Sequence, residues 1–326
     1  MAATQSVPQD DVQQLERLVA AVKRLRAQVA QRIVGQEDVV DGILTAVLAG
    51  GHALLIGVPG LAKTLMVQTV AEALELSFNR VQFTPDLLPA DITGISVYDP
   101  GTSTFDFRPG PVFTQLLLAD EINRTPPKTQ AALLEAMAEE QVSSDGETRP
   151  LPQPFIVLAT DNPIEYEGTY ALPEAQLDRF LIRVSLGYLG LDDEQELLQR
   201  RLRHGWAPPT LSAVVDAETV LAMRESLELV QVEASVLRYV VELVHASRKH
   251  PHVTVGASPR GGLALVAMAR GQAILDRRDF VTPEDVKAVA VPALAHRISL
   301  RPELWVRKVT SSDVVTDLLD TVDVPH

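Results

Sequence analysis

A glycine-containing loop between two apolar segments constrains the fold more than any other stretch of this chain. Gly57–Thr64 has the sequence GVPGLAKT and follows the run Ala53–Ile56, which has the length and composition of a buried strand. The next residues, Leu65–Leu74, repeat apolar side chains with the period of an amphipathic helix. A strand, a glycine loop, Lys-Thr and a helix in this order predict a phosphate-binding loop rather than a chance glycine-rich turn.

The chemistry of such a loop depends on its backbone and on two side chains. Glycine lets backbone N–H groups turn inward around phosphate oxygens, and the helix N-terminus favours an anion. Lys63 can reach the β and γ phosphates, and the Thr64 hydroxyl can bind Mg²⁺. We expect nucleotide contacts from Gly57, Val58, Pro59, Gly60, Leu61, Ala62, Lys63, Thr64 and Leu65.

Ala62 is a departure from the usual pattern, in which glycine precedes the lysine. Alanine is the smallest substitute, and we expect the backbone there not to require a positive φ. The prediction is therefore that Ala62 is tolerated, with its effect on ATP affinity left open.

Length and composition limit the class of protein. The chain has 326 residues, enough for two domains, and 46% of them are hydrophobic, as in a globular protein. It has no cysteine, which excludes disulfides, thiolate catalysis and zinc–thiolate sites. A formal net charge of −14 makes nucleic acid an unlikely partner. No apolar run has transmembrane length and the start lacks a signal-peptide core, so we expect a cytoplasmic protein with no membrane span.

Strand-like and helical segments alternate in the first part of the chain, which predicts a mostly parallel sheet covered by helices. The strands expected after the loop are Val81–Phe83, Leu116–Ala119, Phe155–Ala159 and Leu181–Val184. Two hairpins interrupt this rhythm, one over residues 95–107 and one over residues 141–149. Ahead of the loop, an apolar stripe from about Asp10 to Val29 predicts a helix that packs on the core.

Only helical patterns follow Gly187, so we expect an α/β domain over residues 1–187 and an all-helical lid over residues 188–326. The expected lid helices are Asp192–Arg203, Ala217–Leu227, Ala234–Ser247, Arg260–Leu275 and Glu284–His296.

Two acids end the apolar strand at Leu116–Ala119. Burying Asp120 and Glu121 at the end of a strand has an unfavourable desolvation free energy, which a bound cation would offset. Alternatively, the strand simply runs out into solvent at these residues. Beside a phosphate loop, Asp120 would hold Mg²⁺ through water and Glu121 would polarise the attacking water. Asn162 follows the strand at Phe155–Ala159; it either caps a turn or orients that water between Lys63 and Glu121.

Two arginines are further candidates. Arg260 lies in the first turn of a helix capped by Ser258, where the helix dipole disfavours a cation; it either binds an anion such as phosphate or points into water. Arg179 precedes the last strand and could form an ion pair with Asp178 or Glu174. It could also act as an arginine finger on the γ-phosphate of a neighbouring subunit.

Taken together, these motifs resemble the MoxR family of AAA+ ATPases over about residues 30–300. The segments that carry the resemblance are Ile33–Gln36, Gly57–Thr64, Phe83–Pro89, Phe107–Pro111, Ala119–Arg124, Ala159–Pro163 and Gly168–Phe180. The resemblance implies a five-stranded parallel sheet in the order 5-1-4-3-2, a helical lid and a ring, commonly hexameric, with ATP between subunits. The hairpins would be the helix-2 insert and the pre-sensor-1 hairpin.

The resemblance also implies roles for single residues. Adenine contacts would come from Ile33 and Val34, sensor 1 would be Asn162, the finger would be Arg179, sensor 2 would be Arg260, and a further trans-acting arginine would be Arg124. Asp161 stands where Gln is common in the family.

The expected function is ATP hydrolysis coupled to remodelling of a protein partner. The family is similar to chaperones that mature other proteins or insert cofactors or metals into them, and its partners often carry a von Willebrand factor A domain. Three alternatives stay open: the motor subunit of a metal-chelatase complex, a DNA motor, and an ATP-binding scaffold that hydrolyses poorly because of Ala62.

Overall fold

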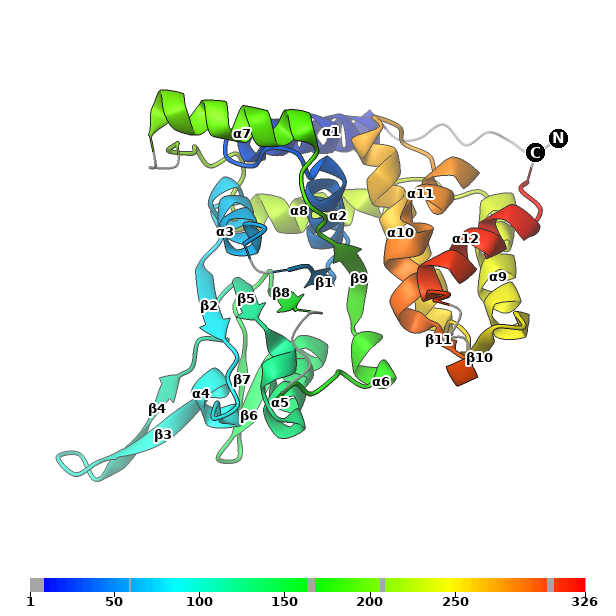
Figure 1. Ribbon diagram of the computed structural model, residues 1–326. Helices are drawn as coiled ribbons and strands as arrows, with labels where there is room; N and C mark the ends of the chain where they lie inside the picture. The colour runs from blue at the N-terminus through cyan, green and yellow to red at the C-terminus, as the bar shows by residue number, and fades with distance from the viewer. Residues whose placement is uncertain (1–8, 59, 163–167, 206–208, 304–307, 326) are drawn as a thin grey trace.

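A five-stranded parallel sheet forms the centre of the computed structural model, which describes residues 9–325 except 59, 163–167, 206–208 and 304–307 (Figure 1). Its strands are β1 (His52–Ile56), β2 (Phe78–Gln82), β5 (Leu116–Asp120), β8 (Ile156–Asp161) and β9 (Phe180–Ser185). They lie in the order β2-β5-β8-β1-β9, with all neighbours parallel. Numbered along the chain, this is the predicted order 5-1-4-3-2, which is confirmed.

Both faces of the sheet are buried, because alternate strand residues belong to two hydrophobic clusters. Ala53 and Leu55 pack in the first cluster, whereas Leu54 and Ile56 pack in the second. The first cluster includes apolar residues of α1 (Gln9–Val29), α2 (Glu37–Leu48) and α3 (Lys63–Ala73), and the second includes those of α4 (Pro89–Thr93) and α5 (Pro127–Glu139). The predicted N-terminal helix is confirmed as α1.

Both predicted hairpins are present. The first, β3 (Gly94–Asp99) and β4 (Thr104–Pro109), forms an arm that projects from the body of the molecule (Figure 1). The second is β6 (Gln141–Ser144) and β7 (Glu147–Pro150), joined by a two-residue turn with positive φ at both positions.

The two hairpins touch each other. The Ser96 hydroxyl donates to Asp145 at the tip of the second hairpin, and the Arg149 guanidinium lies 3.9 Å from the centre of the Phe107 ring. The second hairpin therefore braces the base of the arm.

The C-terminal part is mainly helical, as predicted. Its helices are α7 (Leu191–His204), α8 (Ala217–Leu227), α9 (Ala234–Lys249), α10 (Pro259–Leu275), α11 (Pro283–Leu294) and α12 (Ser311–Thr321), whereas α6 (Glu174–Leu177) precedes β9 in the α/β part. The expectation that no strands follow Gly187 is wrong, because β10 (Val253–Val255) and β11 (Ser299–Leu300) form a short antiparallel ladder. α12 was not predicted, although Thr310 and Asp313 form a capping box at its start.

The helical part packs tightly on the α/β part. α8 contacts α1 and α2, and α11 contacts β9. α10 approaches α2 so closely that a Cβ at Gly271 would lie 2.1 Å from the Thr45 methyl carbon. Glycine at this position permits the close approach of the two helices.

Candidate active site

The phosphate-binding loop connects β1 to α3, as the sequence predicts. Gly60 has φ +89°, a conformation that favours glycine. Ala62 is the residue before α3 and has φ +57°, so the expectation that this position does not need positive φ is wrong. A non-glycine residue in this left-handed region is strained. Pro59 lies outside the described residues, so its predicted contact stays a prediction.

Lys63 begins α3 and is buried beneath this loop. Its Nζ donates a hydrogen bond of 2.5 Å to the Gly57 carbonyl oxygen. Burial lowers the pKa of Lys63, and the negative charges of Asp120, Glu121 and Asp161 oppose that effect. The ammonium group therefore lies among the acids at the carboxyl ends of the strands, where we expected it to meet phosphate.

Asp120 ends β5 and is held by two neighbouring strands. Its Oδ2 accepts hydrogen bonds from Nη2 (2.7 Å) and Nε (3.0 Å) of Arg80 on β2, and its Oδ1 accepts one from the Thr160 hydroxyl on β8 (2.6 Å). Only 11% of the Asp120 side chain is exposed. These contacts fix the orientation of the carboxylate that was predicted to hold the metal.

Glu121 follows Asp120 in the left-handed region, with φ +58°. Its N–H donates to the Thr160 hydroxyl oxygen (2.8 Å), and its Oε2 accepts from Gln82 Nε2 (2.7 Å). Arg124 Nε lies 3.1 Å from the same Oε2. Arg124 was predicted to act on another subunit, and in this chain its guanidinium contacts Glu121 of its own subunit.

Asn162 is placed by the order of the strands. β8 lies between β1 and β5, so Asn162, which follows β8, lies between the segments that carry Lys63 and Glu121. Its exposed fraction is 2%. Asp161 beside it is largely buried, which raises its pKa. This position fits the predicted role of Asn162 in orienting water.

Three residues of this network were not predicted from the sequence: Arg80, Gln82 and Thr160. Arg80 Nη2 also donates to Gln82 Oε1 (2.7 Å), so a continuous chain of hydrogen bonds links the edge strand β2 to both acids. Arg80 and Gln82 are two apart and therefore share a face of β2. Paired polar residues on a strand next to the acids were the signal available in the sequence.

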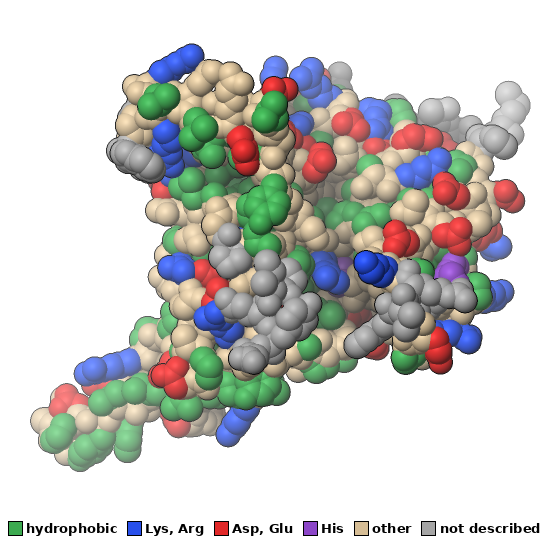
Figure 2. All heavy atoms as spheres, in the orientation of Figure 1, with side chains coloured by type: hydrophobic (Ala, Val, Ile, Leu, Met, Phe, Trp, Pro, Cys, Tyr) green, Lys and Arg blue, Asp and Glu red, His purple; other side chains and the backbone are tan. Residues whose placement is uncertain are grey.

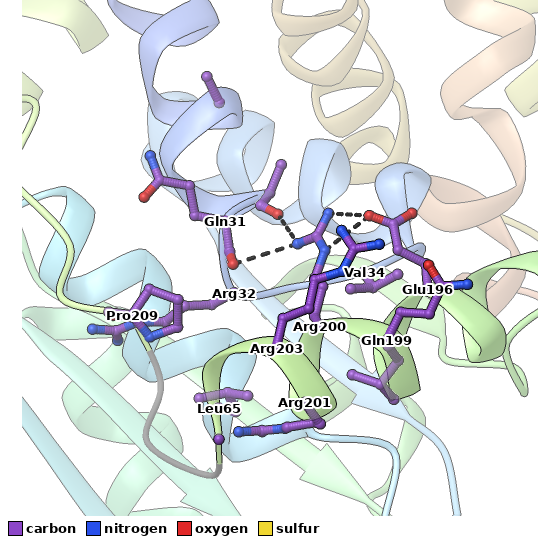
Figure 3. Close-up of a pocket in the computed structure, with 14 residues that line it drawn as sticks. Gln31, Arg32, Val34, Leu65, Glu196, Gln199, Arg200, Arg201, Arg203 and Pro209 are labelled. Carbon is purple, nitrogen blue, oxygen red and sulfur yellow. Dashed lines mark hydrogen bonds and ion pairs between the residues drawn. The ribbon is translucent and has the colours of Figure 1, made fainter.

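Of the two predicted adenine contacts, Val34 lines a cavity and Ile33 does not. Val34 and Leu65 line a cavity of about 580 Å³, to which α7 contributes Arg200 and Arg203 (Figure 3). Arg200 of α7 donates to the Ala30 carbonyl oxygen (2.7 Å) and thereby links α7 to the segment before α2. Ile33 packs in the hydrophobic core and does not line this cavity.

Arg179 and Arg260 lie away from the phosphate loop. Arg179 immediately precedes β9, and Phe180 pairs with His52 at the start of β1. The phosphate loop follows the other end of β1, roughly 16 Å further along the strand direction at about 3.3 Å per residue. Arg179 Nη1 donates to the Leu134 carbonyl oxygen (2.9 Å), and no ion pair joins it to Asp178 or Glu174 among the described residues.

Arg260 lies on the same edge of the sheet as Arg179. Ser258 caps α10, as predicted, and its hydroxyl donates to Asp178 Oδ2 (3.3 Å). Asp178 instead forms its ion pair with Arg297, at 2.7 Å. One chain therefore does not bring Arg179 and Arg260 to its own phosphate loop.

The carboxyl ends of the parallel strands form one side of the sheet, called the carboxyl edge below, and the strand starts form the opposite amino edge. The carboxyl edge fits a nucleotide phosphate with Mg²⁺. It offers a loop with positive φ at Gly60, the start of an 11-residue helix and the Lys63 ammonium. The described residues include no cluster of three or more His, Cys, Asp or Glu that could hold a metal by itself. Mg²⁺ commonly binds through one or two carboxylates together with phosphate oxygens. Asp120 can supply such a carboxylate, and Thr64 can supply a hydroxyl.

Comparison with known proteins agrees with this geometry. Residues 52–182 match the model of the ATPase family associated with various cellular activities (AAA), and residues 245–318 match the AAA lid domain. A crystal structure from Cytophaga hutchinsonii, described as a candidate ATPase, superimposes with a TM-score of 0.89 at 39% identity and covers 96% of this chain and 98% of its own. The fold and site therefore define an AAA+ ATPase domain with its lid.

The relatives define the family more narrowly. Chaperone MoxR1 of Mycobacterium tuberculosis is 42% identical over 325 residues, which is 97% of this chain and 84% of the relative. Protein MoxR of Methylorubrum extorquens is 29% identical over 94% of this chain and 95% of its own length. YeaC of Bacillus subtilis is 45% identical over 90% and 91%. The chain belongs to the MoxR family of AAA+ ATPases.

Among the described helices, none combines the length and the apolar character that crossing a membrane would require.

Proposed function

We propose that this protein hydrolyses ATP at the boundary between subunits of a hexameric ring, and that it thereby remodels a partner protein. The observation that carries the proposal is the division of the candidate site. Lys63, Asp120 and Glu121 meet at the carboxyl edge of the sheet, whereas Arg179 and Arg260 lie at the amino edge. A second copy is needed to join the two sets.

The residues of the carboxyl edge would bind and position the nucleotide. Loop N–H groups and Lys63 would hold the phosphates, and Thr64 and Asp120 would hold Mg²⁺, which when bound neutralises phosphate charge. Glu121 would accept a proton from the attacking water, which Asn162 would orient. Before that, Glu121 has to be released from Gln82 and Arg124, which hold its Oε2 in this structure.

The residues of the amino edge would complete the site from the neighbouring subunit. Arg179 is an exposed arginine whose only hydrogen-bond acceptor among the described residues is a backbone carbonyl. Arg260 is also exposed, and both could meet the γ-phosphate of the next subunit. A guanidinium placed there stabilises the charge of the transition state.

Mixing of variants tests the shared site. Arg179→Ala and Arg260→Ala should each bind ATP and hydrolyse it slowly. Adding Glu121→Gln subunits should restore part of the activity, because some boundaries then pair an intact Glu121 with an intact arginine. Subunit exchange is verified separately with labelled protein. If exchange occurs and no mixing ratio restores activity, the arginines do not act across the boundary.

The partner is proposed from the arm. Ile95, Tyr98 and Phe105 are exposed large hydrophobic residues on it, and the Tyr98 and Phe105 rings lie 5.3 Å apart. Figure 2 shows hydrophobic side chains gathered toward the end of this projection. Such a surface suits a protein client or adaptor, of which one with a von Willebrand factor A domain is the first to test.

Two alternative functions are each favoured by a specific observation. The Magnesium-chelatase 38 kDa subunit of Acidiphilium rubrum is 30% identical over 69% of this chain, which keeps a chelatase-like motor as the second candidate. The strained backbone of Ala62 would favour a scaffold that binds ATP and hydrolyses it poorly. A steady-state ATPase assay of the wild-type protein, with Lys63→Ala as the inactive control, separates the scaffold from an enzyme.

A further inference from the structure

Arg297 is a buried arginine at the junction between the helical part and the sheet. It follows α11 in a short 3-10 helix, Ala295–Arg297, and only 4% of its side chain is exposed. Nε donates to Asp178 Oδ1 (2.7 Å), Nη1 to the Leu181 carbonyl oxygen (3.0 Å) and Nη2 to the Phe180 carbonyl oxygen (2.8 Å). The guanidinium thus joins the end of α11 to the segment that enters β9.

The same segment carries Arg179, which lies between the Asp178 and Phe180 contacts of Arg297. Because the residues on both sides are held by one rigid guanidinium, the backbone of Arg179 has little freedom to shift. Arginine suits this task because its donors lie in a planar fork, whereas lysine offers a single ammonium group.

Asp178 also connects this segment to Arg260. Its Oδ1 accepts from Arg297 and its Oδ2 accepts from Ser258, the residue that caps α10 two positions before Arg260. The Asp178 carboxylate therefore connects the segment before β9 to the end of α11 and to the start of α10. Movement of any one of these three segments would strain the other two.

Positive charge exceeds negative charge at this junction, which favours the binding of an anion. Burial lowers the pKa of Arg297, Asp178 opposes that effect, and the nearby positive charge of Arg260 lowers it further. Among the described residues, Arg260 forms no ion pair of its own. An anion brought to Arg260 would relieve the repulsion between the two cations.

We propose that Arg297 is a positioning residue that holds Arg179 and Arg260 as one unit, so that both reach the phosphate of the neighbouring subunit together. The inference rests on the proposed function, because it assumes that these two arginines act across a subunit boundary. Arg297 itself does not touch the nucleotide; it acts through Asp178 and the backbone on either side of Arg179.

The test is Arg297→Lys, which keeps the positive charge and removes the planar set of guanidinium donors. We expect ATP affinity of the variant to stay within about twofold of wild type, because its own phosphate loop is distant. Turnover should fall about 10- to 100-fold, since small misplacements of catalytic groups have effects of this size. Mixing with Glu121→Gln should restore activity as it does for Arg179→Ala, because that subunit supplies correctly placed arginines. A purely structural defect would not be restored by mixing.

The controls separate the possible failures. Arg278→Lys alters a comparable ion pair with buried Asp285 elsewhere in the helical part, and it should leave turnover unchanged. If Arg297→Lys does not fold, Asp178→Asn removes the shared carboxylate and should give the same restorable loss. Unchanged turnover, or a loss that mixing does not restore while Arg179→Ala is restored, overturns the inference. If Arg179→Ala is not restored either, the shared site of the proposed function fails, and the inference falls with it.

Discussion

The carboxyl and amino edges of the central sheet both carry charged side chains, and they differ in how those charges are balanced. At the carboxyl edge, Asp120 is paired with Arg80 and Glu121 with Arg124 of the same chain. At the amino edge, Arg297 is paired with Asp178, whereas Arg179 donates only to a backbone carbonyl among the described residues. The acids of the carboxyl edge are balanced within the chain, whereas the amino edge presents cations to the surface.

If the site is shared between subunits as proposed, this difference would keep it inactive in a single copy of the chain. The acid that would activate water is restrained by neighbours, and the cations that would stabilise the transition state are on the opposite edge. Joining subunits would supply those cations, and nucleotide would compete for the restrained groups. The first three predictions each alter one edge and leave the other intact, and the last alters neither.

The largest expected effect comes from the carboxyl edge. Glu121→Gln should reduce turnover by roughly 10²- to 10⁴-fold, the range over which general-base catalysis usually contributes. ATP binding should survive, because Lys63 and Asp120 remain. Lys63→Ala should instead weaken binding itself. Steady-state turnover and equilibrium binding of a fluorescent ATP analogue distinguish the two variants, and normal turnover of Glu121→Gln would assign water activation to another group.

Sequence reasoning reached furthest where the candidate residues are contiguous in the chain. Lys63, Asp120 and Glu121 could be recognised because a strand, a loop and two acids in sequence already imply their chemistry, and the sheet order follows from the family resemblance. Arg80 and Gln82 could not be assigned in this way, because their contacts depend on which strand lies beside β5 and in which register.

Other features escaped prediction for different physical reasons. The loop imposes the positive φ of Ala62, and an alanine in the sequence does not indicate such a backbone conformation. β10 has three residues and β11 has two, too few to show an alternating pattern. Arg297 lies 119 residues from Asp178, so their ion pair follows only from the docking of α11 on β9.

The second largest effect concerns stability at the amino edge, where two buried histidines lie. Burial lowers the pKa of His52 to about 4 and that of His296 to about 3. The unfolded chain, with histidine near pKa 6.5, binds more protons in this range, so stability is full above pH 6.5 and is lost as pH falls toward 4. For His52 the loss should reach roughly 3 kcal/mol.

Denaturant unfolding measured from pH 7 to pH 4.5 checks this expectation. His52→Asn should flatten the pH dependence, while His245→Asn, which alters an exposed histidine, should not. At the carboxyl edge the sign is opposite, because burial raises the pKa of Asp161 and so protonation there favours the folded state. Stability that is constant between pH 6.5 and pH 4.5 would contradict the assignment to the histidines.

A smaller effect is expected from the strained loop residue. Ala62→Gly should stabilise the fold by about 1 kcal/mol, because glycine adopts positive φ without the steric penalty of a Cβ. Ala131→Gly is the matched control: it lies exposed in α5, and glycine there should destabilise by about the same amount. Chemical unfolding of the wild-type protein and the two variants measures the change in the free energy of unfolding, which should be positive for Ala62→Gly and negative for Ala131→Gly. A destabilised Ala62→Gly would show that the loop carries no relievable strain.

The smallest effect on turnover is expected from the arm, which belongs to neither edge. The contacts of Asp145 with Ser96 and of Arg149 with Phe107 hold its base, whereas the segment Asp99–Ser103 lies at its far end. Shortening Asp99–Ser103 should therefore leave basal ATPase activity within about twofold, because no residue of either edge changes its contacts.

The same change should weaken recovery of a client or adaptor protein, because the exposed Tyr98 and Phe105 rings flank the removed segment. The measurement is a pull-down with Glu121→Gln loaded with ATP, with and without the shortened loop. Tyr98→Ala combined with Phe105→Ala is the control that keeps the length of the arm and removes its apolar surface. If all three proteins recover the same partners in equal amounts, the arm is not the recognition surface, and its exposed rings would then have to face the interior of the ring or a neighbouring subunit.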